Sequence, residues 1–163
     1  MEESHTVKET ARRHPLDPLS EEVATAVRIL RAHGPASDHW RFVSVNLHEP
    51  AKSELESISG GNTLDRRAFI VVIDLAARRV LEALVSLRDE TLLSCEERRG
   101  VQPGIIVEEF ILCEKAVKAD PRWRAALLRR GITEFDKAIV DPWSAGAYGD
   151  EHFPDHRLAQ GLT

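Results

Sequence analysis

Two histidines near the carboxyl end of the sequence are the residues whose types and spacing best suit metal chemistry. His152 and His156 stand in the acidic stretch 150–156, and imidazole and carboxylate groups are common ligands of divalent transition metals. Pro154 lies between the two histidines and disfavours the helix that would bring both side chains to one face. We therefore interpret this stretch as a solvated acidic loop and predict no metal site in it.

A tryptophan among arginines is the second candidate. Arg122 and Arg124 flank Trp123, and two further arginines follow at 129 and 130, an arrangement that can form a nucleic-acid surface. Helical spacing points Trp123 inward, which leaves the arginines as a solvated face. The formal net charge of -5 also gives no general attraction for polyanions or anionic membranes. We expect no nucleic-acid partner and no membrane association.

Signals for phosphate binding and for nucleophilic catalysis are weak. The polar segment 57–62 contains two glycines, but it lacks the Lys-Ser/Thr ending of a phosphate-binding loop. Ser20, Ser44 and Ser144 have no nucleophile-elbow sequence around them. The sequence thus predicts a flexible strand connection at 57–62 and gives no support for a hydrolase.

Composition is that of a soluble globular protein, with 42% hydrophobic and 30% charged residues in a chain of 163. The first fifteen residues contain no apolar core of the kind that a secretory signal needs, and no later stretch is long and apolar enough to span a bilayer. Cys95 and Cys113 are too few and too far apart for a zinc cluster and fit reduced, buried thiols. These features predict a cytoplasmic protein.

The first half of the chain predicts one helix followed by four strands. The helix has an N-cap and a terminating glycine, with apolar residues at helical spacing between them: Ser20, Val23, Val27, Leu30 and Gly34. Alternation of apolar and polar residues then predicts a strand at 40–47, and a nearly continuous apolar run predicts one at 68–74. Two more strands are predicted at 80–87 and 90–95, joined by a tight turn at 88–89. Because the helix needs a sheet face to cover its apolar stripe, one helix on an antiparallel meander is the simplest α+β module.

A second module begins after the interruption at 101–104. Ile106, Phe110, Cys113 and Val117 share one face of the helix predicted there. Fewer strands follow than in the first module, and each uncovered large apolar side chain forgoes roughly 1.5–3 kcal/mol of burial. We expect this module to be unstable unless something else covers the stripe.

The end of the second module carries clear helix and strand signals. Asp120 and Pro121 are a typical opening of a second helix, and Gly131 closes it. The apolar run 135–140 predicts a strand.

Several blocks of sequence, in the right order, resemble the amino-terminal modules of copper-containing primary amine oxidases of the tyramine or phenylethylamine oxidase type. The blocks in the first half are 14–20, 40–43 and 65–69. Those in the second half are 100–103, 108–110, 119–123, 130–132 and 141–146. The likeness covers about residues 14 to 162.

The resemblance implies a fold and a domain organisation. Family modules of this kind resemble cystatin, with one helix packed on a four-stranded antiparallel sheet, and they precede a large catalytic domain. On this basis residues 16–100 are predicted to be a module like the N2 domain, and 101–163 an incomplete module like the N3 domain. The polar composition of residues 1–15, and the two prolines Pro15 and Pro18 that disfavour helix, independently predict a disordered polar arm with order beginning at Leu19.

The resemblance also implies a chemistry that this chain does not contain. Family enzymes oxidise primary amines to aldehydes with release of ammonia and hydrogen peroxide, using copper and topaquinone, a quinone formed from a tyrosine of the chain. That tyrosine lies in an Asn-Tyr-Asp/Glu motif, which Tyr148 does not match, and the His-x-His copper pair is missing as well. We predict no catalytic, cofactor-binding or metal residue and no cofactor in this chain.

We therefore expect the chain to be the non-catalytic amino-terminal portion of a copper amine oxidase, inactive when alone. Two alternatives are a stand-alone interaction module and a prematurely terminated gene product. The interaction surface would be the face of Ile106, Phe110, Cys113 and Val117, and its partner an amine oxidase catalytic domain or a second copy of the chain.

Overall fold

The structure is a computed structural model; the residues it describes are 14–35, 37–58, 65–145 and 157–163. The candidate metal stretch with His152 and His156 lies outside the described residues, as do Tyr148 and most of the glycine-containing segment 57–62. None of the described helices is long and apolar enough to cross a membrane.

The chain forms two compact units. The first contains helix α1 (Glu22–His33) and most of a four-stranded sheet; the second contains residues 97–163 with the strand segments 39–43 and 72–80. We call α1 with its sheet the α1–sheet module, and residues 99–163 the C-terminal segment. The predicted boundary after residue 100 stays a prediction.

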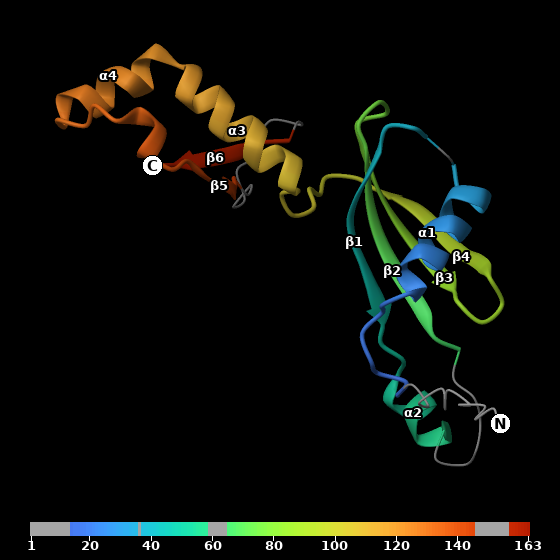
Figure 1. Cartoon of the computed structure of the whole chain (residues 1–163). Helices are drawn as coiled ribbons and strands as arrows, with labels where there is room; N and C mark the ends of the chain where they lie inside the picture. The colour runs from blue at the N-terminus through green and yellow to red at the C-terminus, as the bar shows by residue number, and fades with distance from the viewer. Residues whose placement is uncertain (1–13, 36, 59–64, 146–156) are drawn as a thin grey trace, which may run out of the picture. The chain divides into compact units, whose positions relative to one another are not determined.

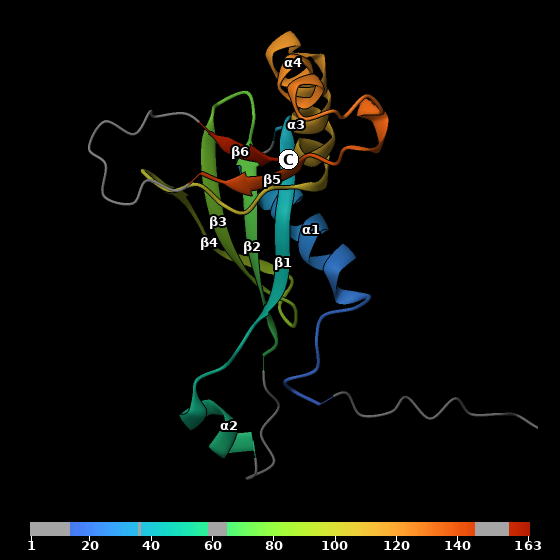
Figure 2. The ribbon, with the colours of Figure 1, turned by 90° about the vertical axis from the view of Figure 1, so that its left-hand side faces the viewer.

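The sheet of the first module is an antiparallel meander. Its spatial order is β1-β2-β3-β4, with bounds β1 (Trp40–His48), β2 (Arg67–Asp74), β3 (Arg79–Ser86) and β4 (Thr91–Arg98). Figures 1 and 2 show α1 lying along one face of this sheet. The predicted α+β fold is confirmed, and the predicted strands agree with the observed ones to within three residues at each end.

The core of the α1–sheet module lies between the helix and the inner face of the sheet. Alternate residues of a strand point to opposite faces, and burial on β2 and β3 follows that alternation over most of their length. The core side chains are Ala26, Ile29 and Leu30 of α1, and Ala68, Ile70, Val72, Leu81, Ala83 and Val85 of the sheet.

The start of α1 differs from the prediction that Ser20 is its N-cap. Glu21 occupies the N-cap position with helical backbone angles and without a side-chain capping bond. Ser20 instead supplies its backbone carbonyl, which accepts a hydrogen bond from the Val23 N–H at 3.1 Å. The first turn is thus closed by backbone, so the hydroxyl of Ser20 is not needed as a cap.

A short helix, α2 (Lys52–Ile58), follows β1 where the sequence predicts only a polar connection. The Glu54 carboxylate accepts a hydrogen bond from the Ala51 N–H at 2.8 Å, and the Glu54 N–H donates to the Ala51 carbonyl at 2.9 Å. This reciprocal pair starts a helical turn without any apolar periodicity, which is why the pattern of apolar residues does not reveal it.

The C-terminal segment contains two consecutive helices and a small sheet. Helix α3 (Val107–Ala119) contacts α4 (Pro121–Arg129) and the two-stranded antiparallel sheet of β5 (Asp141–Ser144) and β6 (Ala159–Leu162). As predicted, Asp120 caps α4, because its carboxylate accepts from the Arg122 N–H at 2.8 Å.

Gly131 ends α4, as predicted. Its φ of +76° is a left-handed conformation that glycine adopts at little cost. The Ile132 N–H donates to the Leu127 carbonyl at 3.0 Å and the Gly131 N–H to the Leu128 carbonyl at 2.9 Å, the two bonds of a Schellman motif.

The predicted strand at 135–140 is wrong. Residues Phe135–Lys137 form a 3-10 turn, η1, closed by hydrogen bonds from Lys137 N–H to Glu134 C=O and from Ala138 N–H to Phe135 C=O. The strand begins later, at Asp141. The Phe135 ring packs 6.2 Å from that of Trp123, and this tertiary contact overrides the strand propensity of the run.

Candidate functional site

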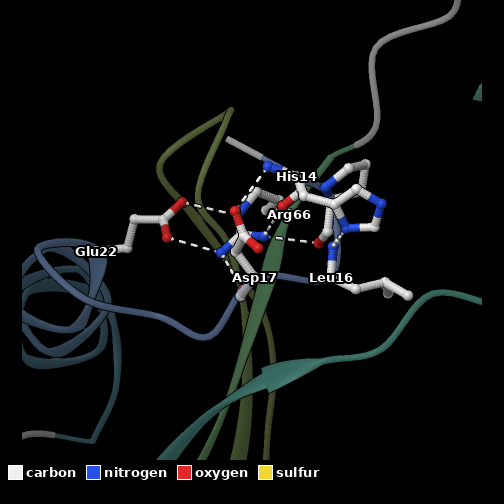
Figure 3. Close-up of polar contacts among 6 residues, drawn as sticks. His14, Leu16, Asp17, Glu22 and Arg66 are labelled. Atoms are coloured by element: carbon white, nitrogen blue, oxygen red, sulfur yellow. Dashed lines mark hydrogen bonds and ion pairs between the residues drawn. The ribbon is translucent and has the colours of Figure 1, made fainter. Parts of the chain in front are cut away.

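An arginine before β2 fixes the approach to the first helix (Figure 3). The Arg66 guanidinium donates to both carboxylate oxygens of Glu22, at 3.0 and 2.9 Å. It also donates to the backbone carbonyls of Pro15 at 2.6 Å, Asp17 at 2.8 Å and His14 at 3.1 Å. All the donor atoms of this side chain are therefore used to hold residues 14–17 and the start of α1 on the sheet.

The segment that Arg66 holds is itself a turn. The His14 N–H donates to the Asp17 carboxylate at 2.7 Å, and the Asp17 N–H donates to the His14 carbonyl at 3.0 Å. The side chains of Arg66 and Glu22 are only 13% and 21% exposed, so their charges are shielded from water. Among the described residues, fixed contacts are thus already made at residues 14–17, before Leu19, the position from which the sequence predicts order.

A second arginine makes the same kind of contact in the C-terminal segment. Arg157 pairs with both carboxylate oxygens of Glu109, one of them at 2.7 Å, and donates to the carbonyls of Pro103 at 2.8 Å and Gly104 at 2.6 Å. Burial acts to raise the pKa of Glu109, but the bonds from Arg157 and from the Ile106 N–H outweigh it and lower that pKa. Neither arginine was singled out from the sequence, because the partners are far apart along the chain.

The buried carboxylate of Asp74 closes the turn between β2 and β3. It is 2% exposed and accepts hydrogen bonds from the N–H groups of Ala76 and Ala77 at 3.2 and 3.1 Å, and from Arg79 at 3.4 Å. Burial acts to raise the pKa of Asp74, but these bonds outweigh it, so the pKa lies below its ordinary value. These three bonds hold the turn, in which Arg78 has a positive φ of 53°.

The tryptophan among arginines is part of the packing of the C-terminal segment. Trp123 is half-buried, and its indole N–H donates to the Thr163 hydroxyl at 3.1 Å. Arg124 lies over the Phe135 ring at 5.4 Å and donates to the Lys118 carbonyl. The predicted inward orientation of Trp123 therefore agrees with its contacts, whereas the absence of a nucleic-acid partner stays a prediction.

The predicted interaction face on α3 is only partly open. Ile106, Cys113 and Val117 are half-buried, and Phe110 is 42% exposed. A Cβ atom added to Gly161 of β6 would stand 3.3 Å from Val117 Cγ2 and 3.5 Å from Cys113 Sγ. The small sheet therefore covers part of the stripe that the sequence left uncovered.

A different set of apolar residues on α3 faces solvent. Val107, Ile111 and Leu112 are 75%, 64% and 64% exposed. Val107, Phe110 and Ile111 are adjacent on the helix surface, because residues three and four apart are neighbours. No residue of α3 is fully buried.

The donor groups of this chain do not fit the copper centre that the resemblance implies for the whole oxidase. Among the residues that the structure describes, no three His, Cys, Asp or Glu side chains are placed to hold a metal ion together. The full sequence contains no His-x-His pair.

Comparison with known proteins agrees with this architecture. Residues 20–95 match the AGAO-like N2 domain. A primary amine oxidase from Arthrobacter sp. (strain P1) is 40% identical over 152 residues, which are 92% of this chain and 23% of that protein. The chain is homologous to the amino-terminal part of copper amine oxidases. A histamine oxidase from Arthrobacter globiformis is 34% identical over 164 residues, 96% of this chain and 23% of that oxidase.

A solved copper amine oxidase has the same fold. The crystal structure of a copper-containing benzylamine oxidase from Hansenula polymorpha superposes with a TM-score of 0.69 over 91% of this chain and 24% of that protein, at 19% identity. The chain spans about a quarter of the length of each of these copper amine oxidases.

Proposed function

We propose that this chain is the non-catalytic amino-terminal portion of a copper and topaquinone-dependent primary amine oxidase and is inactive when alone. The observation that carries the proposal is homology to amine oxidases over 92% of the chain in a sequence without a His-x-His pair or an Asn-Tyr-Asp/Glu motif. In the whole enzyme, copper and the quinone would supply the oxidation of amine to aldehyde. The residues of this chain would supply a folded framework.

The contacts of the described residues support a framework role. The Arg66 and Arg157 side chains donate to carboxylates and carbonyls of their own surroundings. The buried Asp74 likewise accepts hydrogen bonds from Ala76, Ala77 and Arg79 within one turn. A substrate-binding group would need donors or acceptors directed at a ligand. We also propose that residues 101–163 are the counterpart of the N3 domain.

An activity measurement tests the proposal directly. The purified chain is mixed with a panel of primary amines, hydrogen peroxide release is followed, and copper content and quinone staining are measured on the same sample. We expect values equal to the blank for all three, with the full-length Arthrobacter sp. primary amine oxidase as the positive control. Stoichiometric copper with a redox-cycling quinone and amine turnover would contradict the proposal.

A second candidate function is favoured by the exposed side chains of α3. Val107, Phe110 and Ile111 form an apolar patch of the kind that binds a partner, and an amine oxidase catalytic domain is the partner we propose. Co-elution of the chain with an amine oxidase on size exclusion, lost in a Phe110→Ser and Ile111→Ser variant, is expected. No association, or association that the two substitutions leave unchanged, would contradict this candidate, and dimerisation of the chain alone would replace the oxidase by a second copy.

A further inference from the structure

Two buried nitrogen donors lie at one end of the sheet of the α1–sheet module. The Trp40 side chain is 3% exposed, and its indole Nε1 is shielded from bulk solvent. The Nε atom of Arg79 is shielded as well, although 32% of that side chain as a whole is exposed. Among the described residues, no atom accepts a hydrogen bond from either nitrogen. Because a buried donor without an acceptor is costly, this end of the sheet should hold an acceptor for both.

Trp40, Asp74 and Arg79 form a row across three neighbouring strands. Strand β1 begins at Trp40, β2 ends at Asp74 and β3 begins at Arg79, and the strands are adjacent in that order. The Leu75 N–H donates to the His39 carbonyl at 3.2 Å. In an antiparallel pair, this bond sets Trp40 directly opposite Asp74, so the two side chains lie on one face of the sheet. The contact of Arg79 with the Asp74 carboxylate puts Arg79 on the same face.

The guanidinium of Arg79 directs its unpartnered N–H to the side on which Asp74 lies. Nε and Nη2 share one edge of the planar guanidinium, the edge that Arg66 uses to bind both carboxylate oxygens of Glu22. In Arg79, only Nη2 reaches Asp74 Oδ2, at a long 3.4 Å. The parallel Nε–H therefore points beside the carboxylate and not at it.

The charges in this row decide what kind of ligand the two donors take. Arg79 and Asp74 form an ion pair, so their charges offset each other and give no reason to draw a further ion into a buried place. A neutral ligand that accepts two hydrogen bonds and donates one to a carboxylate fits the row. Water meets these requirements, and buried waters make about three hydrogen bonds.

We propose that this end of the sheet is a binding site for one internal water molecule, which accepts hydrogen bonds from Trp40 Nε1 and Arg79 Nε and donates one to Asp74. The water links the first residue of β1 to the first residue of β3 across the last residue of β2. It thereby holds three strand ends together at the point where the chain leaves the sheet for the turn between β2 and β3. The site is independent of the proposed function, because it uses only contacts within this chain.

Nuclear magnetic resonance of the isotopically labelled full chain tests the site. Rotating-frame cross-peaks between water and a protein proton differ in sign for direct contact and for hydrogen exchange. We expect peaks of the direct-contact sign at the Trp40 indole proton and at the Arg79 Nε proton, from a water that stays far longer than surface water. The indole proton of Trp143, which is bonded to Asp141 in a side chain that is 59% exposed, is the internal control and should show no long-lived water.

Two variants each remove one donor and are read at the other. Trp40→Phe keeps an aromatic ring without an N–H, and the water contact of the Arg79 Nε proton should be lost. Arg79→Lys keeps a cation beside Asp74 without the Nε donor, and the water contact of the Trp40 indole proton should be lost. Trp143→Phe is the matched control and should leave both contacts unchanged. A contact that survives the loss of the other donor would overturn the proposal, because one water would then not bridge the two.

A crystal structure of the full chain, grown with bromide in place of chloride, identifies the occupant. We expect an oxygen-sized peak without anomalous signal within about 3.2 Å of both nitrogens. A bromide peak there would show an anion site, and two waters that each contact one nitrogen would remove the bridge. The Trp40 and Phe42 rings are 6.3 Å apart and nearly perpendicular, so an indole N–H directed at the Phe42 ring, with no water beside it, would also overturn the proposal.

Discussion

Helices α1 and α3 are of similar length and open similar modules, but they differ in what covers them. Helix α1 has Ala26, Ile29 and Leu30 buried at 0–1% exposure against a four-stranded sheet. Helix α3 lies on a two-stranded sheet and has no buried residue. At the start of each helix an arginine, Arg66 or Arg157, holds a first-turn glutamate, Glu22 or Glu109, and we call these two contacts the arginine clamps. The clamp therefore places a helix, whereas the width of the sheet decides how much of the helix is buried.

The largest expected effect comes from the same substitution made in both helices. Leu30→Ala should lower the free energy of unfolding by about 2–5 kcal/mol, because it removes a fully buried side chain and leaves a cavity. Leu112→Ala, at a residue that is 64% exposed, should change it by less than about 0.5 kcal/mol. Urea denaturation of both variants measures the difference. Equal losses would remove the distinction between the two helices.

Alanine substitutions of the two clamp arginines should lower the free energy of unfolding by smaller and similar amounts. Arg66→Ala removes the donors that Arg66 directs at the Glu22 carboxylate and at the carbonyls of residues 14–17, so we expect the free energy of unfolding to fall by about 2 kcal/mol. Arg157→Ala should do the same around Glu109.

Lysine at either clamp is the control, since it keeps the charge but lacks the planar fork of donors. Denaturation of Arg66→Lys should give a loss between those of the wild type and Arg66→Ala. If alanine and lysine variants were equally stable, the fork geometry would have no role.

A methyl group tests the packing of β6 on α3. Gly161→Ala places a Cβ 3.2 Å from Val140 Cγ1 and 3.3 Å from Val117 Cγ2, so we expect destabilisation of about 1 kcal/mol. Gly104→Ala is the matched control, because nothing lies within 4 Å of the new atom, and it should be neutral. Hydrogen exchange of the α3 amides reports the change. Unchanged exchange in Gly161→Ala would mean that β6 does not pack tightly against α3.

The smallest effect is the pH dependence of the two clamped or buried carboxylates. The pKa values of Glu109 and Asp74 are lowered below their ordinary values of 4.5 and 3.8. The stability that each carboxylate adds is therefore complete above its ordinary pKa and is lost as the pH falls through the lowered value.

Removing one of these carboxylates should flatten the acid response of its own module. Glu109→Gln should reduce the acid-induced opening of α3 while leaving the α1–sheet module unchanged, and Asp74→Asn should do the reverse. The measurement is the denaturation midpoint at a series of pH values between about 6 and 3, monitored by a separate probe in each module. If both substitutions left the acid response unchanged, groups other than Glu109 and Asp74 would be responsible for it.

Much of the fold could be predicted from local patterns. Alternating or continuous apolar residues located all four strands of the first sheet, and Asp120, Pro121 and Gly131 located both ends of α4 because caps act within a few residues. The same reasoning failed at 135–140, where the contact of Phe135 with Trp123 decides the conformation. Arg66 was visible only as a member of a resembling block, since its contact with Glu22 spans 44 residues.

The bond between the Trp123 indole and the Thr163 hydroxyl ties α4 to the residue after β6. Indole fluorescence depends on hydrogen bonding and solvent contact, so Trp123 is a built-in optical sensor of how β6 is seated. With Trp40 and Trp143 replaced by phenylalanine, a single emission spectrum would follow that strand in real time, without any dye attached to the protein.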